Sequence, residues 1–415
     1  MNTNTYTSLM ERRVRRILLV CNNYDSFALE EDGRIDVQIA QEYAELNLSN
    51  PPSITRAETT DEALEHLSST LSQGEGASPL GGEGLCPIER PVDGHRTNGR
   101  EVFDLILVVY SAGGLDVFDF AAESKRLLPD CPIVLLSAFS KEIYNRIEQH
   151  NRSDIDYFFN WNNSTDLIIA IIKLIEDRMN APHDILEEGV RAILLVEDSV
   201  RYYSTYLPLL YKLVLQQNQI AIRDALNEKQ QLLRKRARPK VLLATCYDEA
   251  IETYRRYETN IIGVISDIGF VLHKGDPSST EKLDAGIDLC RLIRQENPTM
   301  PFLMQSSQEA MSSIAKQLKV GFVVKTSKTL TQELSAYIER EFGFGDFVAI
   351  DPRSGKEIAR ASDLEAFERV ISTISSAAFR RLSDNNYLSK WLFARGLFAI
   401  GRHVQQLQIQ DDTDI

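Results

Sequence analysis

The sequence lacks the features that mark several classes of protein. Its five cysteines are odd in number and form no CxxC pair, which favours reduced thiols in a cytoplasmic protein over a disulfide framework. No apolar run approaches the roughly 20 residues that span a bilayer. The apolar stretch that follows the N-terminal arginines is too short for a signal peptide. We therefore expect a cytoplasmic protein that does not enter a membrane.

Basic residues are too few for a typical nucleic-acid-binding protein. The chain carries 46 Lys and Arg against 60 Asp and Glu, a net charge of −14, whereas nucleic-acid binders normally present a basic face. The local basic clusters at 12–16 and 234–238 adjoin predicted strands or helices and are interpreted as solvated surface. The sequence also has no HExxH, GxSxG or GxxxxGK[ST] motif. We expect no nucleic-acid partner, and none of these motifs nominates a catalytic residue.

What the sequence does contain is an alternation of short apolar segments and amphipathic segments that occurs twice. The predicted strands are 16–21, 53–58, 104–110, 132–137 and 156–160, then 192–197, 240–245, 261–266, 301–306 and 321–325. The predicted helices lie near 36–47, 60–70, 117–128, 141–150 and 164–179, then 199–234, 247–258, 284–296, 309–319 and 328–342. Near-continuous apolar strands indicate parallel sheets covered on both faces. Five such repeats suit an open sheet better than an eight-stranded barrel.

This pattern predicts an α/β protein with two flavodoxin-like doubly wound (βα)5 domains and a small α+β C-terminal segment. The predicted domains are 1–180, 190–342 and 343–415, and the link 177–189 has the composition of a boundary. Two polar insertions interrupt the repeats. The one at 68–100 is rich in Gly, Ser and Pro and is expected to be disordered, and the one at 273–284 is expected to be mobile.

The alternation stops after residue 343. The segment 347–361 has the turn residues of a β-hairpin, and 363–375 and 386–407 are predicted helices. The last of these presents an apolar face made of Trp391, Leu392, Leu397 and Phe398. Packing in a core is the ordinary interpretation of this face, and docking of a partner is the alternative.

Charged and hydroxyl side chains stand where the strands of the second repeat end. Glu197 and Asp198 follow the first strand, Asp267 the third, Ser306 the fourth and Lys325 the fifth. In a doubly wound sheet these ends border the crevice where ligands bind. Each residue taken alone has a structural explanation, but together they form a coherent chemical set. Clustered carboxylates favour Mg²⁺, and a carboxylate can form an aspartyl-phosphate.

In this interpretation Asp267 is the nucleophile toward phosphorus, and Glu197 and Asp198 hold Mg²⁺ together with it. Lys325 neutralises charge on the transferring phosphoryl group, and the Ser306 hydroxyl donates a hydrogen bond to its oxygens.

These segments resemble the receiver domain of bacterial response regulators. "ILLVEDS" is similar to the family's first strand with its acidic pair, "VISD" to the acceptor strand, "PFLMQSS" to the fourth strand and "FVVKTS" to the fifth. Phe322 matches the position of the family's rotating aromatic switch, although a core aromatic explains it equally well. Gly286 resembles the glycine that opens the third helix. Thr326 departs from the usual proline, and the loop after Asp267 is lengthened.

The resemblance implies a phosphorelay protein that takes phosphate from a histidine kinase or phosphotransfer protein. It leaves open whether the protein forms a homodimer.

The first repeat has lost this chemistry. Its strand ends carry Cys21 and Asn22, then Tyr110 (or Val109), Ser137 and Asn160, so that only the hydroxyl of Ser137 remains of the set. Without an acidic pair, an acceptor or a lysine, we expect a degenerate receiver-like domain that is retained for its surfaces. Asp25 lies beyond the strand end, where a role in a turn is expected.

The C-terminal segment has a second resemblance. "FGFGDFVAIDPRSGKEIARASDLEAF" and "LSKWLFARGLFAIG" are similar to the N-terminal region of bacterial phosphoenolpyruvate synthase-like proteins, which carry a PEP/pyruvate-binding dikinase domain. The resemblance implies a regulatory part, or a fragment, that acts on a downstream phosphotransferase domain of this type. Two alternatives stay open: an interaction scaffold that is never phosphorylated, and an ATP-dependent enzyme of the phosphoenolpyruvate synthase type.

Overall fold

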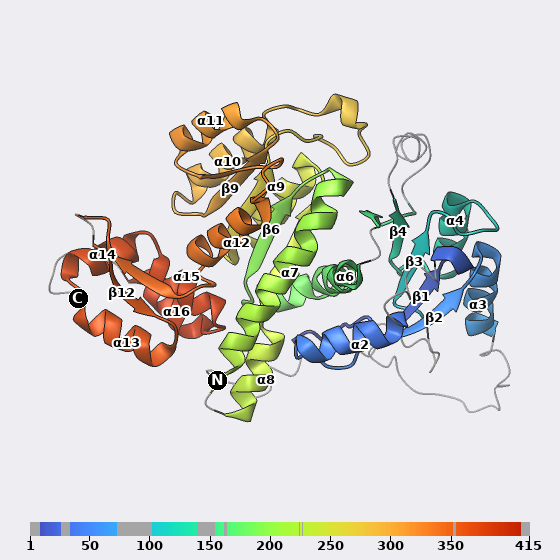
Figure 1. Ribbon diagram of the computed structural model, residues 1–415, viewed down its shortest axis with the longest axis horizontal. Helices are drawn as coiled ribbons and strands as arrows, with labels where there is room; N and C mark the ends of the chain where they lie inside the picture. The colour runs from blue at the N-terminus through green and yellow to red at the C-terminus, as the bar shows by residue number, and fades with distance from the viewer. Residues whose placement is uncertain are drawn as a thin grey trace, which may run out of the picture. The chain divides into compact units, whose positions relative to one another are not determined.

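The protein is described by a computed structural model that covers residues 9–25, 34–72, 102–138, 154–161, 164–223, 225, 227–351 and 354–407. Its contacts divide the chain into two compact units (Figure 1), residues 12–176 (the first unit) and residues 1–11 with 177–415 (the second unit). Most of the predicted disordered insertion, from residue 73, and the predicted helix at 141–150 lie outside the described residues. The predicted three-domain boundaries stay a prediction.

The first unit contains one parallel sheet. Its elements are β1 (Arg16–Val20), α2 (Ile35–Glu45), β2 (Ser53–Ala57), α3 (Thr60–Ser72), β3 (Leu105–Val109), α4 (Val117–Leu127), β4 (Ile133–Ser137), β5 (Tyr157–Asn160) and the first part of α6 (Thr165–Leu186). The strand order is β2-β1-β3-β4-β5. Every residue of β3 and β4 is buried, as expected for strands covered on both faces. Helices α3 and α4 contact each other over the core.

The second unit repeats this topology. Its α/β elements are β6 (Ala192–Val196), α7 (Val200–Arg223), α8 (Glu228–Arg236), β7 (Lys240–Ala244), α9 (Tyr247–Tyr257), β8 (Ile261–Asp267), η2 (Ser278–Thr280), α10 (Ala285–Glu296), β9 (Phe302–Ser306), η3 (Glu309–Met311), α11 (Ser312–Leu318), β10 (Gly321–Val324) and α12 (Leu330–Glu341). The strand order β7-β6-β8-β9-β10 equals that of the first unit. Both sheets have the flavodoxin-like order 2-1-3-4-5, so the predicted fold class is confirmed.

The helices of the second unit contact one another in pairs beside the sheet. Helices α9 and α10 contact each other, and α7 contacts α12. The apolar side chains of α9, α10 and α11 share one core cluster with alternate residues of the strands, such as Leu194 and Val196 of β6. This alternation follows from the two-residue period of a strand, which sends successive side chains to opposite faces.

The link between the two repeats differs from its prediction. The helix expected at 164–179 continues as α6 to Leu186, with Pro182 inside it. The reason is burial, because Ala181 and Ile185 extend the apolar face of the helix into the core of the second unit.

Buried ionic groups fix this end of α6. Asp177, Asp184, Arg238 and Lys240, here called the buried ion group, are each at most 3% exposed. The Lys240 Nζ lies 2.7 Å from Asp184 Oδ2, and the Arg238 Nη2 lies 2.8 Å from Asp177 Oδ1. Asp184 also accepts a hydrogen bond from the backbone N–H of Met10 at 3.2 Å. One face of the segment 177–189 is therefore buried in the second unit, and the two units divide at the start of this segment, between residues 176 and 177.

Two predicted helices are each divided in two. The helix expected at 199–234 consists of α7 and α8. The helix expected at 386–407 consists of α15 (Tyr387–Ala394) and α16 (Phe398–Gln406). Gly396 lies between them with φ +72°, a left-handed conformation that interrupts a helix and that glycine adopts without steric cost.

The C-terminal segment gathers around a hairpin (Figure 1). Strands β11 (Phe347–Ile350) and β12 (Glu357–Ala361) pair antiparallel, as predicted. Helix α13 (Leu364–Thr373) was predicted, and α14 (Ser376–Asp384) was not. The Trp391 ring stacks on Phe367 at a centroid distance of 4.5 Å, and its Nε1 donates to the Gly345 carbonyl at 3.2 Å. The core-packing interpretation of this apolar face is confirmed.

Among the described residues, no helix has the combination of length and apolar character that crossing a bilayer requires.

Replacing Asp184 with Asn is expected to lower the free energy of unfolding by about 3 kcal/mol, because the change leaves the buried Lys240 ammonium without its nearest carboxylate. Urea denaturation of the full chain measures this. Glu187→Gln is the control, because the Glu187 side chain is 70% exposed and should change stability by less than about 0.5 kcal/mol. Equal losses in the two variants would show that the buried ion group does not hold α6.

Candidate functional site

Charged side chains meet at the carboxyl edge of the second sheet. Glu197 directly follows β6, Asp267 ends β8, and Lys325 directly follows β10. Strand β6 is hydrogen-bonded to β8, and this is where the connections of a doubly wound sheet leave in opposite directions. The fold therefore brings together residues that are up to 128 positions apart in sequence.

Lys325 contacts two carboxylates at this edge. Its Nζ lies 2.9 Å from Glu197 Oε1 and 2.6 Å from Glu197 Oε2, and it also pairs with Asp267 Oδ2. Lys325 is 7% exposed and Glu197 is fully buried. The ammonium group also lies 4.3 Å from the ring centroid of Tyr202 on α7. The lysine is thus held by charge on one side and by an aromatic face on the other.

Backbone N–H groups orient the carboxylates. Asp267 Oδ1 accepts a hydrogen bond from Ile268 at 2.7 Å, and Asp198 Oδ2 accepts one from Val271 at 3.2 Å. The loop that follows β8 therefore positions both its own aspartate and the acid that follows β6.

Glu197, Asp198 and Asp267 fit a divalent cation. One ligand oxygen from each lies within 4.8 Å of the others, and oxygen donors of this kind are those that Mg²⁺ and Ca²⁺ accept. Within the described ranges of the chain, no other group of three or more His, Cys, Asp or Glu side chains converges in this way.

Burial and neighbouring charges shift the pKa values of the acids and the lysine in this cluster. Burial raises the pKa of Glu197 to about 8, with a further increase from Asp267 and a decrease from Lys325. Burial, and then the charges of Glu281 and Asp267, raise the pKa of Asp198 to about 7. Burial alone would lower the pKa of Lys325, but Glu197 and Asp267 outweigh it and raise that pKa. The lysine stays protonated, and the raised pKa values show that the three acids resist carrying their full negative charge together without a further cation.

Ser306 and Phe322 lie on the neighbouring strands. Ser306 ends β9 and pairs with Val324 of β10, and its hydroxyl oxygen accepts a hydrogen bond from the backbone N–H of Gln308 at 3.1 Å. Phe322 is half-buried against the core of the second unit. The structure places both on the predicted strands, and their predicted roles as phosphate ligand and switch stay predictions.

The sequence missed two residues near this crevice. Glu281 lies in the lengthened loop after β8, and its charge acts on Asp198 and Asp267. The loop holds several acids, and no spacing rule indicates which one faces the crevice. Tyr206 is fully buried, and no described residue forms a hydrogen bond with its hydroxyl. Burial and the nearby Glu197 and Asp267 raise its pKa. Its spacing of four residues from Tyr202 was the available signal.

Gly286 allows a close approach of α10 to Asp267. Its N–H donates to the Ile268 carbonyl at 2.9 Å, and a Cβ at this position would collide with the carbonyl oxygen of Asp267. The glycine noted in the sequence therefore has a steric reason.

The corresponding edge of the first unit differs. Asn22 Nδ2 donates to the Ser111 carbonyl at 3.0 Å, the backbone N–H of Asp25 donates to Asn22 Oδ1 at 2.8 Å, and Asp25 pairs with the Ser111 hydroxyl. The contact between Asp25 and Asn22 stabilises a local turn, in agreement with the role expected for Asp25. The two contacts with Ser111 join this turn to the segment that follows β3.

No family model matches the sequence, and no curated protein matches it. Solved structures with some similarity include a response regulator receiver domain protein from Clostridium thermocellum (17% identity, 36% of this chain and 91% of that chain, TM-score 0.21). Another is the signal receiver domain of an HD domain-containing protein from Pseudomonas fluorescens (18%, 42% and 96%, TM-score 0.23). A third is a response regulator from Burkholderia pseudomallei with a phosphorylated aspartic acid, calcium ion and citrate (16%, 53% and 97%, TM-score 0.23).

Independently of these similarities, the strand order defines each unit as a flavodoxin-like doubly wound α/β fold. Only the second unit combines this fold with a cluster of three carboxylates and a lysine, as far as the described residues extend.

Replacing Gly286 with Ala is expected to lower the free energy of unfolding by about 1–3 kcal/mol, because the added methyl group overpacks the contact between α10 and β8. Urea denaturation measures the loss. Gly269→Ala is the matched control in the loop that leads from β8 to α10, because its Cβ would meet its nearest neighbour at 3.6 Å, an ordinary contact. A loss at Gly286 no larger than at Gly269 would contradict the steric explanation.

Proposed function

We propose that the second unit is a Mg²⁺-dependent phosphoacceptor of the receiver type, with Asp267 as the acceptor. The observation that carries this proposal is the contact of Lys325 with Asp267 and Glu197 beside Asp198. A buried lysine between two carboxylates at the ligand-binding edge of the sheet is the arrangement that phosphoryl transfer to a carboxylate needs.

Phosphoryl transfer would proceed by displacement at phosphorus. A carboxylate oxygen of Asp267 forms the new bond to phosphorus while the bond from phosphorus to the donor's leaving group breaks, and the leaving group departs with the electron pair. Lys325, already beside Oδ2 of Asp267, pairs with an oxygen of the transferred group. The Ser306 hydroxyl donates a hydrogen bond to another. Glu197, Asp198 and Asp267 would hold Mg²⁺, which would supply positive charge to offset that of the phosphoryl oxygens.

Phosphorylation would be read out through the strands next to the acceptor. Lys325 directly follows β10, and its backbone N–H donates to the Ser306 carbonyl at 2.9 Å. A change in the partners of Lys325 or Ser306 therefore acts on both strand ends together. Phe322 on β10 is half-buried, and we propose that it changes its packing when Ser306 moves toward the phosphoryl group.

A histidine kinase or a phosphotransfer protein is the proposed phosphate donor, because phosphohistidine supplies a leaving group suited to attack by a carboxylate. The proposed downstream partner is a phosphotransferase domain of the phosphoenolpyruvate synthase type. Only the sequence resemblance of the C-terminal segment supports that partner. The scattered cysteines support a cytoplasmic location, and the first unit would contribute surfaces rather than chemistry.

The intact mass of the full chain after incubation with acetyl phosphate tests the proposal. We expect the mass of one phosphoryl group to be gained with Mg²⁺ and a gain reduced at least about tenfold without it, because the repulsion among the acids and the phosphoryl oxygens then has no counter-charge. Asp267→Asn should abolish the gain.

Asp284→Asn is the matched control, because Asp284 is an exposed aspartate at the start of α10. It should be labelled like the wild type. No mass gain on the wild type, or an equal gain on Asp267→Asn, would contradict the proposal and favour a scaffold that is never phosphorylated at this site.

A further inference from the structure

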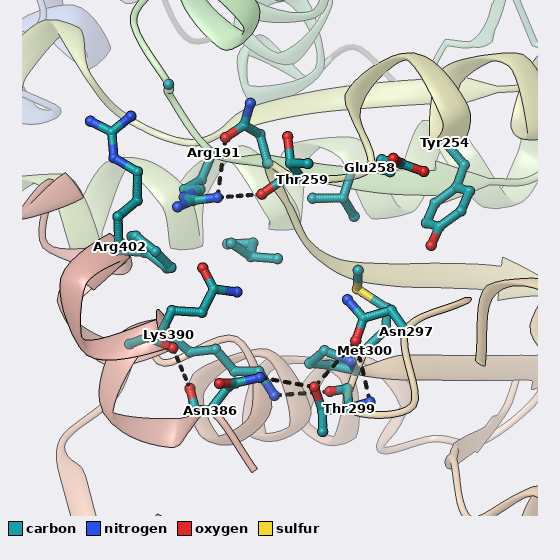
Figure 2. A pocket seen from close by; sticks show the side chains of 18 of the residues that line it. Arg191, Tyr254, Glu258, Thr259, Asn297, Thr299, Met300, Asn386, Lys390 and Arg402 are labelled. Atoms are coloured by element: carbon teal, nitrogen blue, oxygen red, sulfur yellow. Dashed lines mark hydrogen bonds between the residues drawn. The ribbon is translucent and has the colours of Figure 1, made fainter. Parts of the chain in front are cut away.

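A pocket lies at the edge of the second sheet that is opposite the carboxylate crevice. It has a volume of about 890 Å³ and is lined by residues at the amino ends of β6, β8 and β9 and by residues of α15 and α16 (Figure 2). This volume suits a small organic molecule. The pocket is separate from the carboxylate crevice, because the crevice is formed at the carboxyl ends of the same strands.

Arg191 is a buried cation in the wall of this pocket. The residue is 3% exposed, and its guanidinium carbon lies 3.4 Å from the ring centroid of Phe393 on α15. Its Nη1 donates to two neutral acceptors, the Thr259 carbonyl at 2.6 Å and Asn260 Oδ1 at 3.1 Å. Its Nε is buried and has no hydrogen-bond partner in the part of the chain that the structure describes. No carboxylate among the described residues forms an ion pair with it, and a buried charge without a counter-charge is costly.

Arg402 adds a second positive charge on the same side of the pocket. It extends from α16 on the same side of the pocket as Arg191 (Figure 2) and is exposed. Burial, followed by repulsion from Arg402, lowers the pKa of Arg191 to about 10. Two guanidinium groups therefore face one region of the pocket, and a bound anion would relieve both their repulsion and the missing counter-charge.

The other charged side chains that line the pocket indicate where in it an anion would bind. The Lys390 Nζ is already engaged, because it donates to the carbonyls of Thr299 and Asn385, both at 3.1 Å. The carboxylate of Glu258 lines the other end of the pocket from Arg402 (Figure 2) and would repel an anion there. Glu187 and Glu296 also line the pocket. The Glu187 side chain is 70% exposed, and its Oε2 lies 3.7 Å from His183 Nε2. The anionic group is thus directed to the arginine end, and the hydroxyl of Tyr254 is left to contact the rest of the molecule.

We propose that this pocket binds a small organic anion, whose phosphate or carboxylate group pairs with Arg191 and Arg402. Planar guanidinium groups bind both kinds of anion with paired hydrogen bonds. Arg191 directly precedes β6, whereas Phe393 and Arg402 belong to α15 and α16. The ligand would therefore contact the receiver-like sheet and the C-terminal helices at once, and would stabilise their association.

Calorimetric titration of the full chain, without divalent cations, tests the site with two probes: inorganic phosphate and citrate. We expect at least one of them to bind the wild type. Arg402→Gln should weaken that binding roughly tenfold or more, because one charge-assisted partner is lost. Binding of phosphate alone would indicate a phosphate ester as the ligand, and binding of citrate alone a carboxylate.

Arg369→Gln is the control, because it removes the same charge from an exposed arginine on α13 that pairs with Glu365. It should bind like the wild type. Neither substitution is expected to unfold the chain, since both side chains are exposed. The proposal is overturned if neither anion binds the wild type, or if Arg402→Gln binds with unchanged affinity. Asp267→Asn should retain the binding, which separates this site from the phosphoacceptor.

Discussion

The contact of one lysine with two carboxylates organises the functional edge of this protein. Lys325 would be costly to bury alone, and so would Glu197, which is completely enclosed. Their distances of 2.6 and 2.9 Å, together with the pairing of Lys325 and Asp267, offset part of that cost. Asp198 adds a third acid, and burial and mutual repulsion raise the pKa values of Glu197 and Asp198. A bound cation would relieve that repulsion, which is why the crevice suits one.

The second sheet therefore presents different chemistry at its two edges. Carboxylates gather at the carboxyl ends of β6 and β8, and arginines gather near the amino ends, beside the C-terminal helices. The same strands connect the two edges, and each strand is only 4 to 7 residues long. A doubly wound sheet is expected to bind its ligand at the carboxyl edge. The amino edge becomes a second binding region because α15 and α16 pack near it.

The sequence predicted the strands well and the ends of the helices less well. Apolar runs such as "AILLV" identify buried strands without knowledge of their neighbours, and the acids that follow them were found from strand order alone. The extension of α6 was missed because Pro182 and the acids suggested a boundary. Asp177 and Asp184 become buried only because Arg238 and Lys240, some sixty residues later, pair with them. Such distant pairs leave no local pattern.

The residues that line the pocket could not be predicted either, because they are brought together from distant parts of the sequence. Arg191 looks like an ordinary basic residue before a strand, and nothing in its neighbourhood predicts the ring of Phe393 at 3.4 Å. Glu281 and Tyr206 likewise acquire their relation to the crevice only through the loop after β8 and the packing of α7. Sequence order identified the cluster of carboxylates and lysine because all its members stand at strand ends, where the fold itself fixes their position.

The central claim is that Asp267 accepts a phosphoryl group, and borohydride trapping tests it most directly. Borohydride reduces an aspartyl-phosphate to homoserine, so peptide mapping after treatment with acetyl phosphate, Mg²⁺ and borohydride identifies the acceptor position. The account predicts homoserine at position 267 and aspartate unchanged at position 198. Homoserine at another aspartate, or none in the chain, would contradict it.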